Sequence, residues 1–195
     1  MTNAPNLPIS QIFTGAHGWH YKVDNTVDTG LTRVAPSDID AAEQRLGVVF
    51  PDVLRRLYLV QNGGVIEDIV IPAASALSGH SEETLVYPFV NGALPPVQAL
   101  TGLVPFWDVA FQAQEYADLF GLLRPPLPDN ADQMIVLSDW PGQVLLLDLR
   151  APGRSPVGLC ALYYDGRPQE PRWQSDGLWW ADAECFFNNL QRVPG

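Results

Sequence analysis

SDIDAAEQRLGVVFPDVLRRLYLVQNGG, residues 37 to 64, is the stretch that decides the fold, because it predicts two short helices joined by a turn. Ser37 is a residue type that accepts amide hydrogens at the start of a helix, and the acids after it suit the positive end of the helix dipole. Apolar residues then recur at helical spacing as far as Leu46. Gly47 follows, and glycine ends a helix at low cost by adopting the left-handed conformation.

The second helix of this stretch is predicted to begin at Pro51. Proline suits the first position of a helix, since its missing amide hydrogen would have no partner there. Leu57 belongs to a single apolar face of this helix, and the neighbouring arginines point away from it. Asn62, Gly63 and Gly64 then predict a flexible stop.

This succession of capped helices resembles the SUKH (Smi/Knr-like) superfamily. Downstream, the apolar run at 134–139 is followed by a second run at 142–148, which ends in Leu-Asp at Asp148, and then by a closing helix that contains Phe186. In that family a strand pair ending in Leu-Asp precedes a terminal helix of this type. The resemblance covers about residues 36 to 192.

The resemblance and the composition together predict one α+β domain. A chain of 195 residues with 47% hydrophobic content is long enough to bury one sizeable core. We expect a central, mostly antiparallel sheet of about four to six strands, packed with the N-terminal helix pair and a C-terminal helix. Residues 1–35 are expected to form an N-terminal extension, and residues 36–192 the SUKH-like domain with an inserted helical segment near 105–125.

Alternating and continuous apolar runs between turn signals predict the remaining elements. They are strands over residues 65–71, 84–90, 133–138, 143–149 and 157–164, a short strand near 19–23, and a helix over 108–122. The strands at 133–138 and 143–149 are expected to form a hairpin across 139–142. Asp182 is expected to cap the last helix.

The chain has no predicted membrane span or signal peptide. No stretch contains about 18 consecutive apolar residues, and the N-terminus lacks a charged start followed by an apolar segment. We therefore expect a cytoplasmic protein. Cys160 and Cys185 are the two cysteines, and reduced thiols are the expected state in that compartment.

The acidic charge is unevenly distributed along the chain. The formal net charge is -11, and no Lys or Arg occurs between Arg56 and Arg124. A surface of this kind would repel nucleic acid, whose binding needs cations that neutralise phosphates. It would attract a basic protein by electrostatic steering. The alternative interpretation is that these acids only keep the surface solvated.

Few residues suggest catalysis or metal binding. His17 and His20 are three apart, but Gly18 argues against a helix there and no third ligand is near in sequence. His80 stands beside serine and glutamates in a predicted loop. Cys160 lies in a predicted buried strand, which suits packing rather than a reactive thiolate. We therefore predict no catalytic residue, metal or cofactor.

Tryptophans in or near predicted loops are candidates for a protein interface, because they bury a large area at little entropic cost. Trp140 is the best surface candidate, since it lies in the predicted hairpin turn. Trp179 and Trp180 have the alternative role of packing under the final helix. Asp148, at the end of a predicted strand, is expected to be structural and to cap a turn.

The leading hypothesis is a non-enzymatic binding protein. Members of the resembled superfamily are widely immunity proteins that bind a cognate bacterial toxin, and fungal relatives act in cell-wall regulation. We expect a cognate toxin or other basic protein as partner, no nucleic acid or membrane, and a monomer or weak homodimer. The residues predicted to form or border the contact surface are Glu67, Asp68, Glu82, Glu83, Asp108, Asp139 and Trp140.

Two alternative functions stay open at the level of sequence. One is a regulatory scaffold that binds a housekeeping partner in a cell-wall or signalling assembly, because a scaffold does not fix function. The other is a small hydrolase that uses His80 with an acid. A neighbouring toxin gene would favour immunity over the scaffold role, and a fully active His80→Ala variant would exclude the hydrolase.

Overall fold

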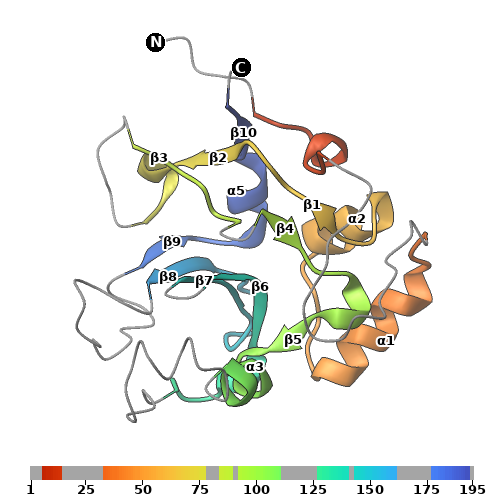
Figure 1. The fold of residues 1–195 in the computed structure, drawn as a ribbon. Helices are drawn as coiled ribbons and strands as arrows, with labels where there is room; N and C mark the ends of the chain where they lie inside the picture. The colour runs from red at the N-terminus through yellow and green to blue at the C-terminus, as the bar shows by residue number, and fades with distance from the viewer. Residues whose placement is uncertain are drawn as a thin grey trace.

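A computed structural model describes residues 6–14, 33–77, 84–89, 92–110, 127–140, 143–161 and 177–193, except for the side chains of Trp140 and Ala161. Its helices and three antiparallel sheets form a single α+β domain (Figure 1). The helices are α1 (Pro36–Leu46), α2 (Asp52–Val60), α3 (Leu103–Ala110) and α5 (Ala183–Asn188), with short 3-10 turns η1 (Ile9–Gln11), η2 (Ala73–Ser75), η3 (Val97–Ala99) and η4 (Ala131–Gln133).

The largest sheet has five strands, in agreement with the predicted size and direction of the central sheet. Its order is β5 (Thr101–Gly102), β6 (Met134–Trp140), β7 (Gln143–Asp148), β8 (Val157–Ala161) and β9 (Leu178–Trp180). A second sheet pairs β10 (Gln191–Arg192), β2 (Ile69–Pro72) and β3 (Leu85–Val86), and a third pairs β1 (Gly64–Val65) with β4 (Ala93–Leu94). In the view of Figure 1, the β10–β2–β3 sheet lies above the five-stranded sheet.

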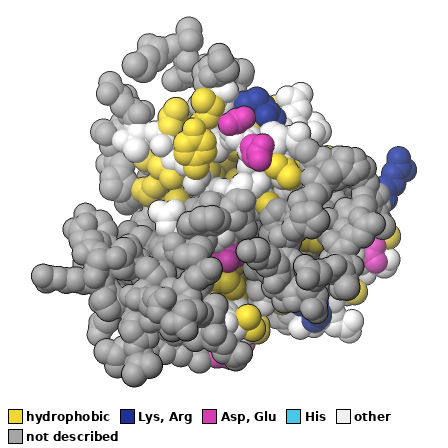
Figure 2. Space-filling view, viewed as in Figure 1, with side chains coloured by type: hydrophobic (Ala, Val, Ile, Leu, Met, Phe, Trp, Pro, Cys, Tyr) yellow, Lys and Arg dark blue, Asp and Glu magenta, His cyan; other side chains and the backbone are white. Residues whose placement is uncertain are grey.

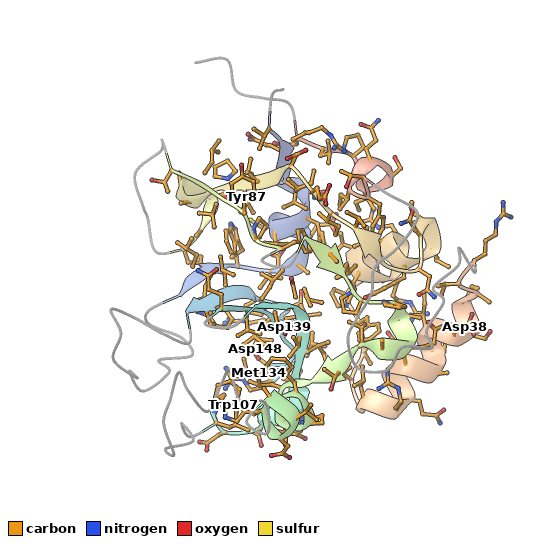
Figure 3. The ribbon with its side chains drawn as sticks, viewed as in Figure 1. Asp38, Tyr87, Trp107, Met134, Asp139 and Asp148 are labelled. Carbon is orange, nitrogen blue, oxygen red and sulfur yellow. The ribbon has the colours of Figure 1, made fainter. Side chains whose placement is uncertain are left out.

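Apolar packing covers both faces of the five-stranded sheet. Leu145 and Leu147 of β7 belong to the main core with α1, α2 and α5, whereas Val144 and Leu146 face a second core under α3. Successive strand residues point to opposite faces. This is why β7 is a continuous apolar run. Figure 3 shows Trp107 of α3 on the side of the second core.

Helix α1 begins one residue before the predicted cap. The N-cap is Ala35, Pro36 is the first helical residue, and Ser37 lies inside the first turn. The carboxylate of Asp38 accepts the amide hydrogen of Ala35 at 2.8 Å, so the capping side chain comes from within the helix. The prediction of Ser37 as the cap was wrong, because proline at the first position with this acid provides an alternative start. Gly47 ends α1 as predicted, with φ of 69°.

Helix α2 has the predicted apolar face, but it begins one residue later than predicted. Pro51 is the N-cap in extended conformation, and Asp52 is the first helical residue. Leu57 and Tyr58 are fully buried in the main core. The helix ends at Val60, before the Asn-Gly-Gly stretch.

The predicted strand at 65–71 is two strands in different sheets. Asp68 interrupts it with a φ of 56°, a left-handed conformation that Asp tolerates better than most residues. Glu67 and Asp68 therefore form the connection from β1 to β2. The predicted strand at 84–90 is shorter than expected and contains only Leu85 and Val86 among the described residues.

The predicted helix at 108–122 begins earlier than expected. Helix α3 starts at Leu103 and is described as far as Ala110, so Asp108 lies within it and not at its start. The remainder of that predicted helix lies outside the described residues, as does the predicted strand near 19–23. The boundaries of the N-terminal extension and of the inserted segment stay predictions.

The predicted hairpin is present, but its first strand continues two residues farther than expected. Asp139 and Trp140 pair with Val144 and Gln143, so they belong to β6 and not to the turn. The predicted loop position of Trp140 was therefore wrong, because pairing continues to the end of β6.

The C-terminal tryptophans also lie in a strand rather than in loops. Trp179 and Trp180 belong to β9 and face opposite cores. Trp180 packs edge-on against Phe186 of α5 at 5.1 Å between ring centroids, which confirms the packing role. Asp182 caps α5 as predicted, and its side chain accepts the amide hydrogen of Cys185 at 2.7 Å.

Within the described part of the chain, the helices are all too short or too polar to cross a bilayer.

Candidate partner-binding surface

The Asn-Gly-Gly stretch contacts the segment formed by residues 94–98. Asn62 accepts the amide hydrogen of Val97 at 2.9 Å and donates to the side chain of Gln98 at 2.9 Å. Gly63 has a φ of 75°, and a Cβ there would lie 2.7 Å from backbone atoms of residues 94–96. Tyr58, fully buried, donates its hydroxyl hydrogen to the carbonyl of Pro95 at 2.9 Å. This part of the family-like motif therefore builds the scaffold.

Asp148 also has a structural role, as predicted from its position at the end of β7. Its carboxylate accepts the backbone amide hydrogen of Arg150 at 3.1 Å and pairs with the guanidinium of Arg150 at 2.6 Å. The hydrogen bond to Asp148 raises the pKa of Arg150 above its ordinary value. This ion pair fixes the turn from β7 toward β8.

The arginines of α1 and α2 are partnered within the protein. Arg55 pairs with Asp40 and Glu43 of α1, and Arg56 pairs with Glu184 of α5 at 2.8 Å. The guanidinium of Arg45 donates to three backbone carbonyls of residues 97–100. These cations connect secondary-structure elements, and their charge is largely offset by internal partners.

The structure brings together only some of the predicted partner-binding residues. Glu67 and Asp68 are adjacent and exposed. Asp108 is exposed on α3, at the opposite end of the molecule in Figure 1. Asp139 is half-buried in β6. Glu82, Glu83 and the side chain of Trp140 lie outside the described residues, so their part in the contact surface stays a prediction.

Two exposed apolar residues lie in or next to β3, which pairs with the end of β2 that is distant from the Glu67–Asp68 connection. Leu85 is 49% exposed and Tyr87 is 58% exposed. They flank Val86, which packs against the main core, so they lie on the outer side of β3. Figure 2 shows hydrophobic side chains gathered over this upper sheet beside charged ones, and Figure 3 labels Tyr87 there.

The acidic connection lies close to the chain that follows these residues. The amide of Ile66 donates to the carbonyl of Gly92 at 2.7 Å, and the Glu67 side chain lies 3.8 Å from the position of a Cβ on Gly92. Strand β3 is at the edge of its sheet. We call Glu67, Asp68, Leu85 and Tyr87 the upper-sheet surface.

Sequence reasoning identified the acids of this surface and missed its apolar residues. Residues 84–89, TLVYPF, are almost continuously apolar. Such a run does not indicate which face of a strand is buried. The feature that indicates exposure of these residues is the position of β3 at the edge of its sheet, and this position is known only from the order of strands in the structure.

The family-model comparison gives a match to the SMI1 / KNR4 family (SUKH-1) over residues 33–178, which is most of the chain. The chain belongs to this family. No curated protein and no solved structure matched it. Membership of SUKH-1 confirms the resemblance carried by the helix pair and is consistent with an immunity or regulatory domain.

The described part of this SUKH-1 domain offers no group of His, Cys, Asp and Glu side chains that could hold a metal ion. His17, His20 and His80 lie outside the described residues, so the hypotheses about them are untested. Cys160 is buried in β8, as its sequence context predicted, and Cys185 is half-buried in α5. Burial raises the pKa of the Cys160 thiol to about 12.

We expect Cys160 to resist alkylation in the folded SUKH-1 domain. At about pH 8.5 a pKa near 12 leaves the Cys160 thiol almost wholly protonated. Burial also raises the pKa of the Cys185 thiol, but that residue is only half-buried and stays accessible to the reagent. Mass spectrometry after iodoacetamide treatment should find Cys185 modified well before Cys160, and both modified in urea. Equal native rates at the two cysteines would contradict the burial of Cys160.

Proposed function

We propose that this SUKH-1 domain is a non-enzymatic immunity protein that neutralises a cognate bacterial toxin by binding it on the upper-sheet surface. The observation that carries the proposal is the exposure of Leu85 and Tyr87 on a sheet whose strand β2 directly follows the exposed acids Glu67 and Asp68. Family membership supports an immunity or regulatory role. The position and chemistry of this surface favour protein binding.

The apolar residues provide the centre of the proposed interface. Tyrosine is enriched at protein interfaces because it buries a large area and keeps a polar tip. Leu85 and Tyr87 leave about half of each side chain in water. Covering them with a partner would gain hydrophobic free energy without any change in the main core, since Val86 already fills the inner side of β3.

The acidic residues indicate a basic partner. Glu67 and Asp68 lie in the sequence region between Arg56 and Arg124, which contains no Lys or Arg. Arg192 of the neighbouring strand β10 lies close to them, and its guanidinium donates to the carbonyl of Gln11. Charges at the border of an interface mainly increase the association rate and favour complementary partners. Nuclease toxins are themselves basic because they engage nucleic acid. An acidic inhibitor would both attract such a toxin and compete with its substrate.

The proposed test combines co-purification with the product of the neighbouring gene and a growth-rescue assay. We expect Leu85→Arg to weaken binding at least about tenfold, because it places a cation at the centre of an interface with a basic partner. Leu59→Arg is the matched control, since Leu59 of α2 is also 49% exposed. It should change binding less than about twofold.

Equal losses for the two leucine variants would contradict the upper-sheet surface. Glu67→Lys combined with Asp68→Asn, which keeps a side chain that tolerates the left-handed φ of residue 68, should slow association and reduce its salt dependence, with little change in thermal stability. Binding without growth rescue would contradict immunity and favour the regulatory scaffold. A thermal unfolding curve for each variant separates lost binding from lost folding.

A further inference from the structure

The outer edge of β3 carries backbone groups that do not bond to β2. In the β2–β3 pair, Leu85 lies opposite Pro72. Proline has no amide hydrogen, so Pro72 and Leu85 cannot be a hydrogen-bonded pair of an antiparallel ladder. The bond from the amide of Ala73 to the carbonyl of Thr84, at 2.8 Å, fits this register. The amide and the carbonyl of Leu85 therefore point away from β2.

Tyr87 continues this outer edge. It precedes Pro88, and a residue before proline favours extended backbone. In an extended chain the backbone groups of successive residues point to alternate edges, so those of Tyr87 point the same way as those of Leu85. Within the described segments, the backbone groups of these two residues have no hydrogen-bond partner.

Other sheet edges of the molecule are contacted by neighbouring chain. Strand β10 is the opposite edge of this sheet (Figure 1), and the guanidinium of its Arg192 donates to the carbonyl of Gln11 at 2.9 Å. Strand β9 is an edge of the five-stranded sheet, and the carbonyl of Trp179 accepts the amide hydrogen of Leu77 at 2.6 Å. Strand β3 has no such contact among the described residues. Its segment 84–87, TLVY, also lacks the charged and proline residues that usually block an exposed edge.

The side chains beside this edge suit a second strand. Leu85 and Tyr87 are 49% and 58% exposed on one face, and Val86 packs against the main core on the other. A strand added to β3 would place alternate side chains directly beside Leu85 and Tyr87. In this mode of recognition the backbone bonds give affinity, and the alternate side chains give specificity.

We propose that β3 binds its partner by strand addition, in which an extended segment of the partner pairs with the outer edge at Leu85 and Tyr87 and lengthens the sheet by one strand. This inference rests on the proposed function and adds to it the conformation of the partner's binding segment. The chain between Arg56 and Arg124 contains no Lys or Arg. Basic residues of the added segment therefore meet no like charge from β2 or β3.

The test measures fluorescence anisotropy with the full chain and a short labelled peptide of alternating valine and lysine, which is basic and favours an extended strand. This peptide should bind saturably. A peptide of alternating glycine and lysine has the same charge but no apolar side chains and a low strand propensity. It should bind at least about tenfold more weakly, which separates strand addition from charge attraction alone.

Leu85→Ala and Leu85→Pro separate the contribution of the side chain from that of the backbone. Both reduce the apolar side chain, but only proline also removes the outward amide hydrogen. Proline is tolerated on an edge strand where its missing amide hydrogen would face solvent. We expect Leu85→Pro to weaken peptide binding about five- to tenfold beyond Leu85→Ala. Thermal unfolding of both variants checks that each remains folded.

Amide hydrogen exchange, followed by NMR in the unmodified protein, locates the new bonds. The amides of Leu85 and Tyr87 should exchange rapidly in the free protein and slowly with the valine–lysine peptide. The amide of Val86, which points toward β2, should be protected in both states. The proposal is overturned by a lack of saturable binding, by equal binding of the alanine and proline variants, or by unchanged exchange at Leu85.

The immunity proposal fails separately, in the toxin co-purification and growth-rescue assays. Toxin binding that is lost in Leu85→Arg, together with equal peptide binding by Leu85→Ala and Leu85→Pro, would leave the upper-sheet surface in place and exclude strand addition.

Discussion

Replacement of Gly63 by alanine is expected to lower the free energy of unfolding by about 3 kcal/mol or more, from a clash added to left-handed strain. The added Cβ would lie 2.7 Å from the carbonyl oxygen of Leu94 and from backbone atoms of Pro95 and Pro96. Backbone cannot rotate away as a side chain can. The segment after β4 would have to move, and the Tyr58 hydrogen bond to Pro95 would be lost with it.

Gly47→Ala is the matched control for this prediction. Gly47 has nearly the same φ as Gly63, 69° against 75°, but a Cβ there meets nothing within 4 Å. Its replacement should cost only about 1 kcal/mol, from the left-handed conformation alone. Urea unfolding followed by circular dichroism measures both variants. Equal costs at the two glycines would show that residues 94–96 do not press on Gly63.

These two glycines also show how far the sequence could predict the fold. A glycine after an amphipathic run is sufficient to predict the end of α1 at Gly47, because that conformation is a local property. At Gly63 the sequence predicts only a stop. The close contact of Gly63 is with residues 94–96, more than thirty residues later in the chain. No local sequence pattern indicates which segment will pack against this glycine.

The strand errors have the same physical origin. The run at 65–71 is apolar enough for one strand, but a left-handed Asp68 divides it between two sheets. Hydrophobicity predicts burial, whereas sheet membership depends on partners distant in sequence. The β6–β7 hairpin was predictable because its partners are adjacent in the chain.

The same distinction applies to the candidate site. Glu67 and Asp68 could be identified from sequence, because they lie in a long region that contains no Lys or Arg. The exposure of Leu85 and Tyr87 could not, because it follows from the position of β3 at the edge of its sheet. Asp108 lies far from them for a similar reason, since α3 covers the other sheet.

Removal of the Asp148 carboxylate is the second change expected to have a large effect. Asp148→Ala should lower the free energy of unfolding by about 3 kcal/mol, because the largely buried guanidinium of Arg150 loses its ion-pair partner and keeps only the carbonyl of Asp129 as an acceptor. The side chains of Arg150 and Asp148 are only 16% and 12% exposed. The variant also removes the acceptor of the Arg150 amide hydrogen, and chemical unfolding measures the combined loss.

Three further variants separate charge from geometry at this turn. Asp148→Asn keeps an oxygen for the Arg150 amide and loses the charge, so it should be less damaging than alanine. The double variant Asp148→Leu, Arg150→Met removes both charges and should recover most of the loss.

Glu184→Ala breaks an ion pair of similar length whose side chains are more than half exposed, and should cost less than about 1 kcal/mol. If Glu184→Ala were as costly as Asp148→Ala, burial would not be what makes the Asp148–Arg150 pair important. The two ion pairs differ in their exposure to water, which screens an unpaired charge. Asp148 alone also accepts a backbone amide hydrogen, and Asp148→Asn isolates the share of that bond.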